Sequence, residues 1–286
     1  MNHFVELTRL KKPIGYMLLF WPCSWGLTLA YDFSNNLNLY IFYLILFFLG
    51  SVLMRSAGCI VNDIVDKDFD KKVSRTKYRP IASGKVSVKV GLIYTSTLCF
   101  LALLVLINFN WHTILLALGS MPLAFSYPLM KRFTYWPQLF LGITFNYGLI
   151  LGWTCIKEGI EIVPIVLYVG AIFWTLAYDT IYGFQDIKDD EIIGIKSTSI
   201  KFKKNPKLFL LLCYSVFIVS LFTLGILMSF SYIFYFFMLL LIAHLFFYQI
   251  YNFNFQSPKS CLKIFKSNNF LGFMILINLI IGKTLI

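Results

Sequence analysis

The chain has 286 residues, of which 59% are hydrophobic and 13% charged, and its mean hydropathy is +0.76. A soluble domain carries about 25% charged residues, so this composition excludes an ordinary soluble enzyme and indicates a membrane protein. The 30 Phe and 17 Tyr residues suit a lipid-facing surface with aromatic side chains at the interfaces. The net charge of +12 raises the possibility of a nucleic-acid partner, which the placement of the charges argues against.

Apolar runs of roughly 20 residues, long enough to cross a bilayer, recur along the whole sequence. They predict an all-α, polytopic membrane protein whose helices surround a central cavity open to the cytoplasmic face. The first run is too long for a secretory signal and lacks a small-residue cleavage site, so we expect it to remain as a span. About nine transmembrane helices are expected, at residues 14–31, 38–62, 88–107, 110–128, 137–156, 162–183, 207–229, 231–252 and 268–286.

Lys and Arg are distributed unevenly between the two sides of this arrangement. With nine spans, 22 of the 25 basic residues lie on the face that holds the N-terminus and the loops after the even-numbered spans. Lys157 and Lys283 lie on the other face, and Arg55 lies inside a span. Because basic loops stay in the cytoplasm, we expect the N-terminus to be cytoplasmic. The positive charge is therefore mainly a topology signal, and no nucleic-acid partner is expected.

The cysteines and histidines show no pattern typical of a site. The six Cys residues are scattered and form no CxxC pair, so we expect small apolar side chains packed in helices rather than zinc ligands or disulfides. The three His residues are far in sequence from the acidic segments, which argues against a His-ligated metal. Neither common type of glycine-rich phosphate loop is present.

The acidic residues are the most informative ones. Nine of the 13 fall within residues 63–70 and 179–191, where two long apolar helices end on the predicted cytoplasmic face. In each segment they recur at helical spacing, and like charges at that spacing repel one another. Oxygen ligands without His or Cys favour Mg²⁺, whereas the alternative is a solvated helix end with scattered charge. The predicted Mg²⁺ ligands are Asn62, Asp66, Asp70, Asp186 and Asp190.

Basic residues flank both acidic segments. Arg is well suited to bind phosphate through two parallel hydrogen bonds. A metal ion together with Arg and Lys side chains stabilises the negative charge on a diphosphate as it leaves. A membrane enzyme with such a site takes a lipid-tailed diphosphate, with its tail among the helices and its head group at the cytoplasmic mouth. The residues expected to bind the diphosphate are Arg75, Arg79, Lys131, Arg132 and Lys196.

Two charged residues lie deeper in the predicted spans. Arg55 precedes Asn62 by seven residues, which places it on the same helix face about 10 Å further into the membrane. Asp179 precedes Asp186 by the same interval. An ionisable residue at that depth is functional by default. We expect Arg55 to hold the carboxylate of an acceptor or to pair with Asp63 or Asp179. We expect Asp179 to orient the acceptor or take its proton, or to form a helix–helix hydrogen bond.

Three motifs resemble those of the UbiA family of membrane prenyltransferases. The segment "NDIVDKDFD", from Asn62, is similar to the first acidic motif of that family, NDxxDxxxD. The segment "YDTIYGFQDIKDDEIIGIKST", from Tyr178, is similar to the second, and "RTKYRPIASG" resembles the turn after the first. The resemblance is close over residues 8–205 and implies a single UbiA-type membrane domain over residues 1–286.

The resemblance also implies a reaction. The prenyl C–O bond of a polyprenyl diphosphate ionises with the help of Mg²⁺, and an aromatic ring carbon ortho to a hydroxyl attacks the allylic cation. The segments "RLKKPIG" and "MRSAGCIVND" favour 4-hydroxybenzoate as the acceptor, in a membrane step of ubiquinone biosynthesis. A multi-pass protein of a bacterial inner membrane is expected, with the acidic motifs cytoplasmic and no obligatory protein partner. The expected catalytic residues are Asp66, Asp70, Asp179, Asp186 and Asp190, and the expected acceptor-binding residues are Arg55, Tyr127 and Tyr178.

Other functions stay open at this point. Within the family, a naphthoate, homogentisate or haem acceptor is compatible with the same motifs, because the motifs concern the donor and the metal. A secondary transporter places its charges at mid-bilayer in broken, repeated helices, whereas these acids lie at helix ends. An enzyme like the CDP-alcohol phosphotransferases gathers its Asp residues in one composite motif rather than two.

Overall fold

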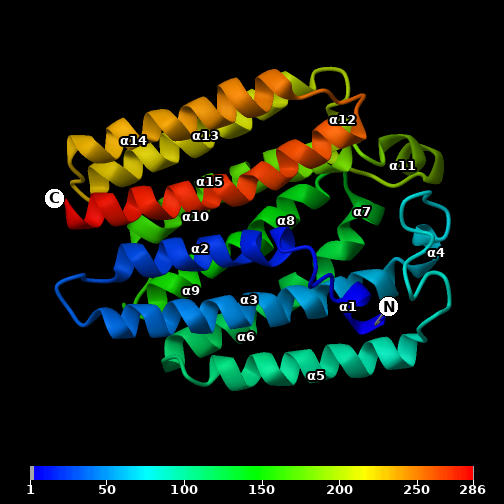
Figure 1. Ribbon diagram of the computed structural model, residues 1–286, viewed down its shortest axis with the longest axis horizontal. Coiled ribbons are helices and arrows are strands. Elements are labelled where there is room, and N and C mark those ends of the chain that lie inside the picture. The colour runs from blue at the N-terminus through cyan, green and yellow to red at the C-terminus, as the bar shows by residue number, and fades with distance from the viewer. Residues whose placement is uncertain (1–2, 286) are drawn as a thin grey trace.

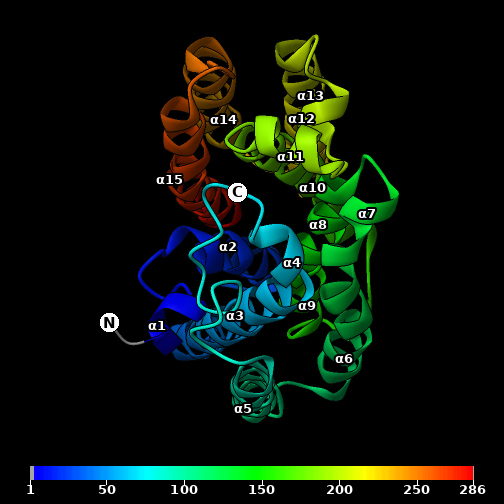
Figure 2. The same cartoon turned by 90° about the vertical axis from the view of Figure 1, so that its right-hand side faces the viewer.

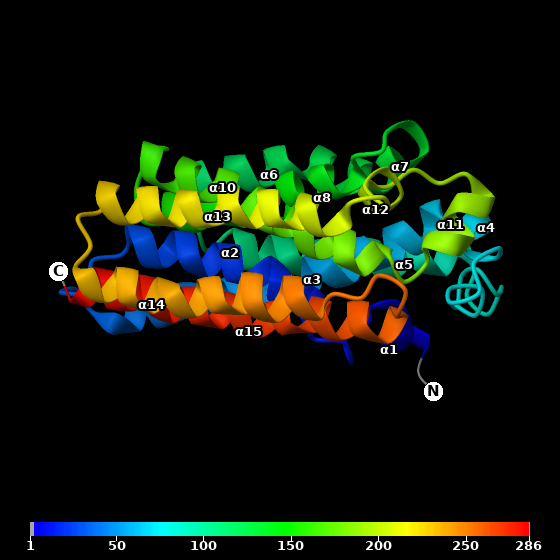
Figure 3. The ribbon, with the colours of Figure 1, turned by 90° about the horizontal axis from the view of Figure 1, so that it is seen from above.

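The computed structural model describes residues 3–285, which form a helical bundle without a β-strand in that range (Figure 1). Most helices lie nearly parallel to one long axis, and short helices gather at one end (Figure 3). The helices in chain order are α1 (His3–Leu7), α2 (Ile14–Ala30), α3 (Leu37–Val65), α4 (Lys67–Asp70), α5 (Val88–Leu106), α6 (Trp111–Ser126), η1 (Tyr127–Leu129), α7 (Met130–Phe133), α8 (Pro137–Asn146), α9 (Gly148–Thr154), α10 (Ile162–Gly183), α11 (Ile187–Ile193), α12 (Thr198–Lys201), α13 (Pro206–Leu227), α14 (Tyr232–Ile242), η2 (Ala243–Ile250) and α15 (Pro258–Thr284).

Among the described residues, seven helical stretches are long and apolar enough to cross a membrane. They are α3, α5, α6 with η1 and α7, α10, α13, α14 with η2, and α15. The other two expected spans are the shorter α2, with 17 residues, and the α8–α9 pair, which is interrupted at Tyr147. The all-α, polytopic fold is thus confirmed, with nine as an approximate number of spans.

The last helix begins earlier than the apolar pattern predicts. We expected it at residue 268, but α15 begins at Pro258. Ser257 caps the helix by accepting a hydrogen bond from the Ser260 backbone N–H, and proline is well suited to a first helical position. The additional turns carry three lysines and extend the helix beyond its apolar part. Hydropathy identifies only the apolar part of α15, whereas the capping residue Ser257 and Pro258 determine where the helix begins.

Helix α2 lies at the centre of the bundle and packs very closely on α9. A Cβ atom built at Gly26 would lie 2.0 Å from the Leu149 carbonyl oxygen, and one built at Gly152 would lie 2.2 Å from the Cys23 carbonyl oxygen. Only glycine permits this approach of two backbones, as is common where helices meet in membranes. The contact fixes α2 against the interrupted α8–α9 segment, which forms one wall of the cavity described below.

Both acidic segments lie at the same end of the bundle. Helices α4 and α11 lie at the right-hand end of Figure 1, together with α1, α7 and α12, whereas the C-terminus lies at the other end. Figure 2, which looks onto that end, shows α4 and α11 separated across the face, with α5 at the edge of the bundle. We refer to this end as the polar end, since it carries the predicted cytoplasmic loops.

Substitution of two glycines by alanine should have opposite effects on stability. Gly152→Ala forces α2 and α9 apart and should lower the free energy of unfolding by about 1–3 kcal/mol, as overpacking does. The matched control is Gly119→Ala on α6, where a Cβ meets no atom within 4 Å. That change should stabilise the protein by up to about 1 kcal/mol, because alanine favours the helix. Thermal unfolding in detergent measures both, and equal melting temperatures would contradict the close packing of α2 on α9.

Candidate active site

Helix α3 ends where its acidic residues begin. Asp66 leaves helical geometry, with φ −95° and ψ 6°, and the four-residue α4 follows it. The backbone N–H groups of Asp66 and Asp70 still bond to the carbonyls of Asn62 and Asp66, so the chain continues to coil. As a result Asp63, Asp66 and Asp70 are buried, with exposed fractions of 2%, 1% and 6%. Carboxylates so removed from water need charged partners.

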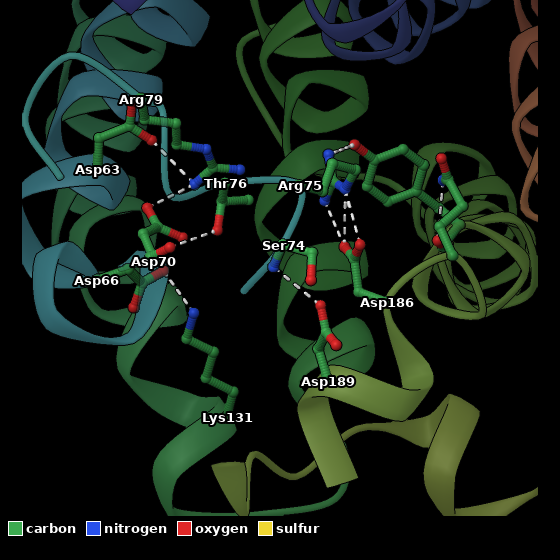
Figure 4. A network of polar contacts seen from close by, with 12 residues as sticks. Asp63, Asp66, Asp70, Ser74, Arg75, Thr76, Arg79, Lys131, Asp186 and Asp189 are labelled. Carbon is green, nitrogen blue, oxygen red and sulfur yellow. Dashed lines mark hydrogen bonds and ion pairs between the residues drawn. The ribbon is translucent and has the colours of Figure 1, made fainter. Parts of the chain in front are cut away.

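Arg79 and Arg9 supply partners for two of these carboxylates. Arg79 Nη1 donates to Asp63 Oδ1 at 3.1 Å and to Asp70 Oδ2 at 2.7 Å (Figure 4). Arg9, from the segment after α1, donates to the same Asp63 oxygen at 2.6 Å. One guanidinium therefore joins two carboxylates that would otherwise repel each other. The network ties the N-terminal segment and the loop after α4 to the end of α3.

Asp66 has a different partner and one free oxygen. Lys131 Nζ, from α7, donates to Asp66 Oδ2 at 2.5 Å. The other oxygen, Oδ1, is buried and has no hydrogen-bond partner within residues 3–285. Burial raises the pKa of the Asp66 carboxyl, and the Lys131 ammonium opposes that effect. An unpaired buried carboxylate oxygen is costly, which suggests a ligand at this position.

The second acidic segment follows α10. Asp186 precedes the first residue of α11, and Gly194, with φ 81°, ends that helix. Arg75 donates to both oxygens of Asp186, with Nε at 2.8 Å from Oδ1 and Nη2 on Oδ2 (Figure 4). The neighbouring Ser74 N–H donates to Asp189 Oδ2 at 2.9 Å. The loop after α4 thus binds carboxylates of both acidic segments and brings them to one site.

Asp190 lies within this second segment without a direct partner. Its carboxylate makes no hydrogen bond or ion pair with any residue from 3 to 285. Burial, followed by repulsion from Asp186, raises the pKa of Asp190 to about 6. Like Asp66 Oδ1, this carboxylate is available to a cation that the protein itself does not supply.

The donor atoms at the polar end fit a divalent cation in chemistry. They are carboxylate oxygens from two facing segments, which hard cations such as Mg²⁺ prefer. Among residues 3–285, however, no three His, Cys, Asp or Glu side chains gather closely enough to form a complete metal site. Lys and Arg occupy most of the carboxylates instead. Asp66 Oδ1 and the Asp190 carboxylate are the exceptions, and they make the arrangement compatible with a metal.

An apolar cavity lies inside the bundle, and none of the carboxylates of the polar end lines it. It has a volume of about 230 Å³ and lies among α2, α3, α5, α6, α8 and α9. Arg55 and Tyr127 line it, and both belong to the halves of their helices nearest the polar end. Arg55 Nε is buried without a hydrogen-bond partner among the described residues, and its guanidinium lies 5.5 Å from the centre of the Phe145 ring.

Arg55 has no carboxylate within ion-pair distance in the described chain. Asp63, one of its two expected internal partners, pairs with Arg9 and Arg79 instead. Asp179, the other, is close enough for an electrostatic interaction with Arg55 but forms no hydrogen bond to it. Arg55 therefore lines the cavity as a buried guanidinium without a carboxylate partner among the described residues. Its unpaired Nε lies against Gly15 of α2, where an added Cβ would be 2.8 Å away.

The remaining predicted residues lie around the site rather than in the ion-pair network. Arg132 donates to the Val65 carbonyl at 2.7 Å, and Lys196 donates to the Phe133 carbonyl at 3.2 Å. The Asn62 side chain has no partner within residues 3–285. Tyr178 does not line the cavity, because it packs between the rings of Trp174 and Phe265.

Sequence reasoning missed several members of the network. Asp63, Arg9, Ser74 and Asp189 carry contacts of the same kind as the predicted residues. Asp63 and Asp189 stand beside motif positions, so their proximity in sequence was a signal. Nothing in the sequence pairs Arg9 with Asp63, because the contact joins residues 54 positions apart.

The comparisons with known proteins agree with this geometry. Residues 19–276 match the model of the UbiA prenyltransferase family. The chain belongs to the UbiA prenyltransferase family. It is 41% identical over 283 residues to a Drosophila pseudoobscura protein named 4-hydroxybenzoate polyprenyltransferase, mitochondrial, covering 99% of this chain and 70% of that one. It is 42% identical to the Bos taurus protein of the same name, covering 98% of this chain and 75% of that one.

A solved UbiA structure has the same fold. A UbiA homologue from Archaeoglobus fulgidus bound to GPP and Mg²⁺ superposes with a TM-score of 0.68 at 20% identity, over 98% of this chain and 99% of that one. At 20% identity, this similarity is evidence for the fold alone. The Drosophila and Bos relatives carry mitochondrial names, so they do not support the bacterial inner membrane expected from the sequence.

The Asp63 ion pairs should contribute to stability. Asp63→Asn leaves Arg9 and Arg79 short of a buried countercharge, and breaking such a pair costs about 3–5 kcal/mol. The melting temperature in detergent should fall clearly. The matched control is Asp68→Asn, because the Asp68 side chain is 85% exposed and pairs only with Lys71. If the two variants melt alike, the Asp63 network is not a stabilising element.

Proposed function

We propose that this membrane protein transfers a polyprenyl group from a polyprenyl diphosphate to 4-hydroxybenzoate, at the ring carbon ortho to the hydroxyl. The observation that carries the proposal is the similarity of about 41% identity, over nearly the whole chain, to proteins named for that activity. The convergence of both acidic segments beside an apolar cavity supports it, because a lipid-tailed diphosphate needs both parts.

The diphosphate and its metal belong at the polar end in this proposal. Asn62, Asp66, Asp70, Asp186 and Asp190 would hold Mg²⁺, which supplies positive charge that stabilises the departing diphosphate. Arg75, Arg79 and Lys131 now neutralise carboxylates and would turn their N–H groups to phosphate oxygens when metal replaces them. Arg132 and Lys196 bind backbone carbonyls at the same mouth and can contribute further positive charge.

The acceptor belongs beside Arg55 and Tyr127. Arg55 lines the cavity and has no carboxylate partner among the described residues, and guanidinium matches a carboxylate with two parallel hydrogen bonds. A carboxylate held there places the aromatic ring between Arg55 and the diphosphate. Tyr178 packs inside the aromatic core, so its part in the proposal is to support this wall rather than to touch the acceptor.

The reaction then balances with the residues present. The bond between the prenyl C1 and the diphosphate oxygen breaks, and the oxygen keeps the electron pair. A ring carbon ortho to the hydroxyl forms the new C–C bond to C1, and the proton that this carbon then loses goes to the departed diphosphate or to water. Asp179, which has no hydrogen-bond partner in the described chain, would orient the acceptor hydroxyl or accept its proton. Aromatic side chains near the cation contribute roughly 1–2 kcal/mol each.

The protein is a multi-pass membrane protein, and its orientation is part of the proposal. The excess of Lys and Arg at the polar end supports an orientation with the N-terminus and both acidic segments on the cytoplasmic face. The bilayer delivers the hydrophobic donor, and the aromatic acid enters from the aqueous side. No nucleic acid and no obligatory protein partner enter this account.

A product assay tests the proposal directly. Membranes that contain the protein receive a labelled prenyl diphosphate and, separately, 4-hydroxybenzoate, a dihydroxynaphthoate and homogentisate, with Mg²⁺ or with excess chelator. A prenylated 4-hydroxybenzoate that forms only with Mg²⁺ supports the proposal. Product from only one of the other acceptors would disprove 4-hydroxybenzoate as the acceptor. Full turnover in the presence of chelator would disprove the requirement for Mg²⁺.

Loss of one metal ligand should abolish most of the activity. Asp66→Ala or Asp186→Ala should reduce kcat by at least about 100-fold, because charge builds on the diphosphate in the transition state. Asp68→Ala is the matched control, since that carboxylate is exposed and pairs with Lys71. Turnover near that of the unchanged protein in both variants, at equal membrane levels, would disprove the metal-site assignment.

Arg55 should act on one substrate only. Arg55→Ala should raise the KM for the aromatic acceptor by about tenfold or more and change the KM for the prenyl diphosphate by less than about twofold. Arg55→Lys keeps the charge without the two parallel hydrogen bonds, so an intermediate value is expected. Equal losses of affinity for both substrates would instead indicate that Arg55 has only a structural role.

A further inference from the structure

The apolar cavity has a definite length along α3. Its lining on that helix runs from Gly58, near the polar end, to Leu46. The twelve helical steps between these two residues span about 18 Å. The lining is almost entirely apolar along this path, so it suits a hydrocarbon chain. The cavity is therefore deep enough to hold part of a prenyl tail.

Aromatic rings close the far end of the cavity. Phe47 and Phe109 both line it, and their ring centres lie 4.8 Å apart. Tyr43 stacks on Phe109 from behind, at 5.4 Å. Both phenylalanines are buried, so this floor is packed rather than loose.

The wall between α5 and α6 is different. Helix α5 packs along α3, whereas α6 contacts α8 and α9, and the two consecutive helices have no extensive contact with each other. Residues of both line the cavity. Figure 2 shows α5 standing apart at the edge of the bundle. This wall of the cavity is therefore the one with little direct helix–helix packing across it.

Gly50 lies about midway along the cavity, and like Gly58 and Gly119 it is a helix glycine at which an added Cβ would meet no neighbouring atom. Of these three, Gly50 and Gly58 line the cavity, and Gly58 lies at its end nearest the polar end. At Gly26, Gly152 and several others, an added Cβ would strike a neighbouring atom, which explains glycine there. At Gly50 an added Cβ meets nothing within 4 Å, and the residue lines the cavity. Glycine destabilises a helix interior relative to alanine, and no packing contact accounts for it here.

The distance from the reaction site to Gly50 matches a chain of several isoprene units. Gly50 lies twelve residues, or about 18 Å, from Asn62. An extended chain advances about 1.2 Å per main-chain bond, so an isoprene unit with four such bonds covers roughly 5 Å. A geranyl tail of two units ends before Gly50, whereas a tail of four units or more passes it.

We propose that Gly50 is a specificity-determining residue, which lets prenyl tails of four or more isoprene units pass the middle of the cavity. The inference rests on the proposed function and specifies its donor as a long-chain polyprenyl diphosphate. The tail runs along α3 past Gly50 to the Phe47–Phe109 floor, and units beyond that floor pass between α5 and α6 into the bilayer.

The experiment compares two donors in one protein. The full-length protein in membranes, with Mg²⁺ and 4-hydroxybenzoate, is assayed with geranyl diphosphate and with a donor of eight units. Gly50→Phe should lower the ratio of kcat/KM for the long donor over the short donor by about tenfold or more. Gly119→Phe is the matched control, because Gly119 is exposed on α6, outside the cavity lining, with equal space for a Cβ. Its ratio should stay within about twofold of that of the unchanged protein.

The outcomes separate this inference from the proposed function. If the unchanged protein transfers neither prenyl group, the proposed function fails. If it is active and Gly50→Phe leaves the ratio unchanged, or lowers both kcat/KM values equally in a folded protein, the role of Gly50 is wrong. Gly50→Leu fills less of the cavity and should shift the ratio in the same direction by a smaller factor. It decides the question if the phenylalanine variant does not accumulate in membranes.

Discussion

Ion pairing of buried carboxylates at one end of the bundle is the interaction on which the rest of the structure depends. Asp63, Asp66 and Asp70 are almost fully removed from water, and an unpaired charge in that position costs several kcal/mol. Their partners come from α7, from the segment after α1 and from the loop after α4. The same loop carries Arg75 to Asp186, on the other acidic segment. Charge neutralisation therefore also assembles the polar end from segments that are distant in sequence.

The same network explains how one site can exist with and without its ligands. Arg and Lys hold the carboxylates while no cation is bound, so the polar end keeps its shape. A divalent cation and a diphosphate together bring positive and negative charge, and they can take over these contacts without leaving a buried charge unpaired. Below them, the cavity is apolar apart from a few groups, of which Arg55 carries an unpaired N–H. In the proposed function, the head group, the acceptor and the tail therefore have separate environments.

Much of this arrangement follows from the sequence, and the exceptions have physical causes. Hydropathy predicts the spans because apolar length is a local property, and the two acidic segments are predicted at one membrane face because charge bias sets topology. The start of α15 at Pro258 was missed because capping, not hydropathy, decides it. The contact of Arg9 with Asp63 and the packing of Tyr178 away from the cavity depend on tertiary contacts, which no local pattern encodes. Gly50 became informative only once its surroundings were known.

The central claim is that the two acidic segments form one site that binds a prenyl diphosphate through a divalent cation. The most direct test is the affinity of the purified protein for a prenyl diphosphate, measured by calorimetry without any acceptor, across a series of Mg²⁺ concentrations. The account predicts that the affinity rises with Mg²⁺ by about tenfold or more and that Asp66→Ala and Asp186→Ala each remove the rise. An affinity that is the same in Mg²⁺ and in chelator would contradict it.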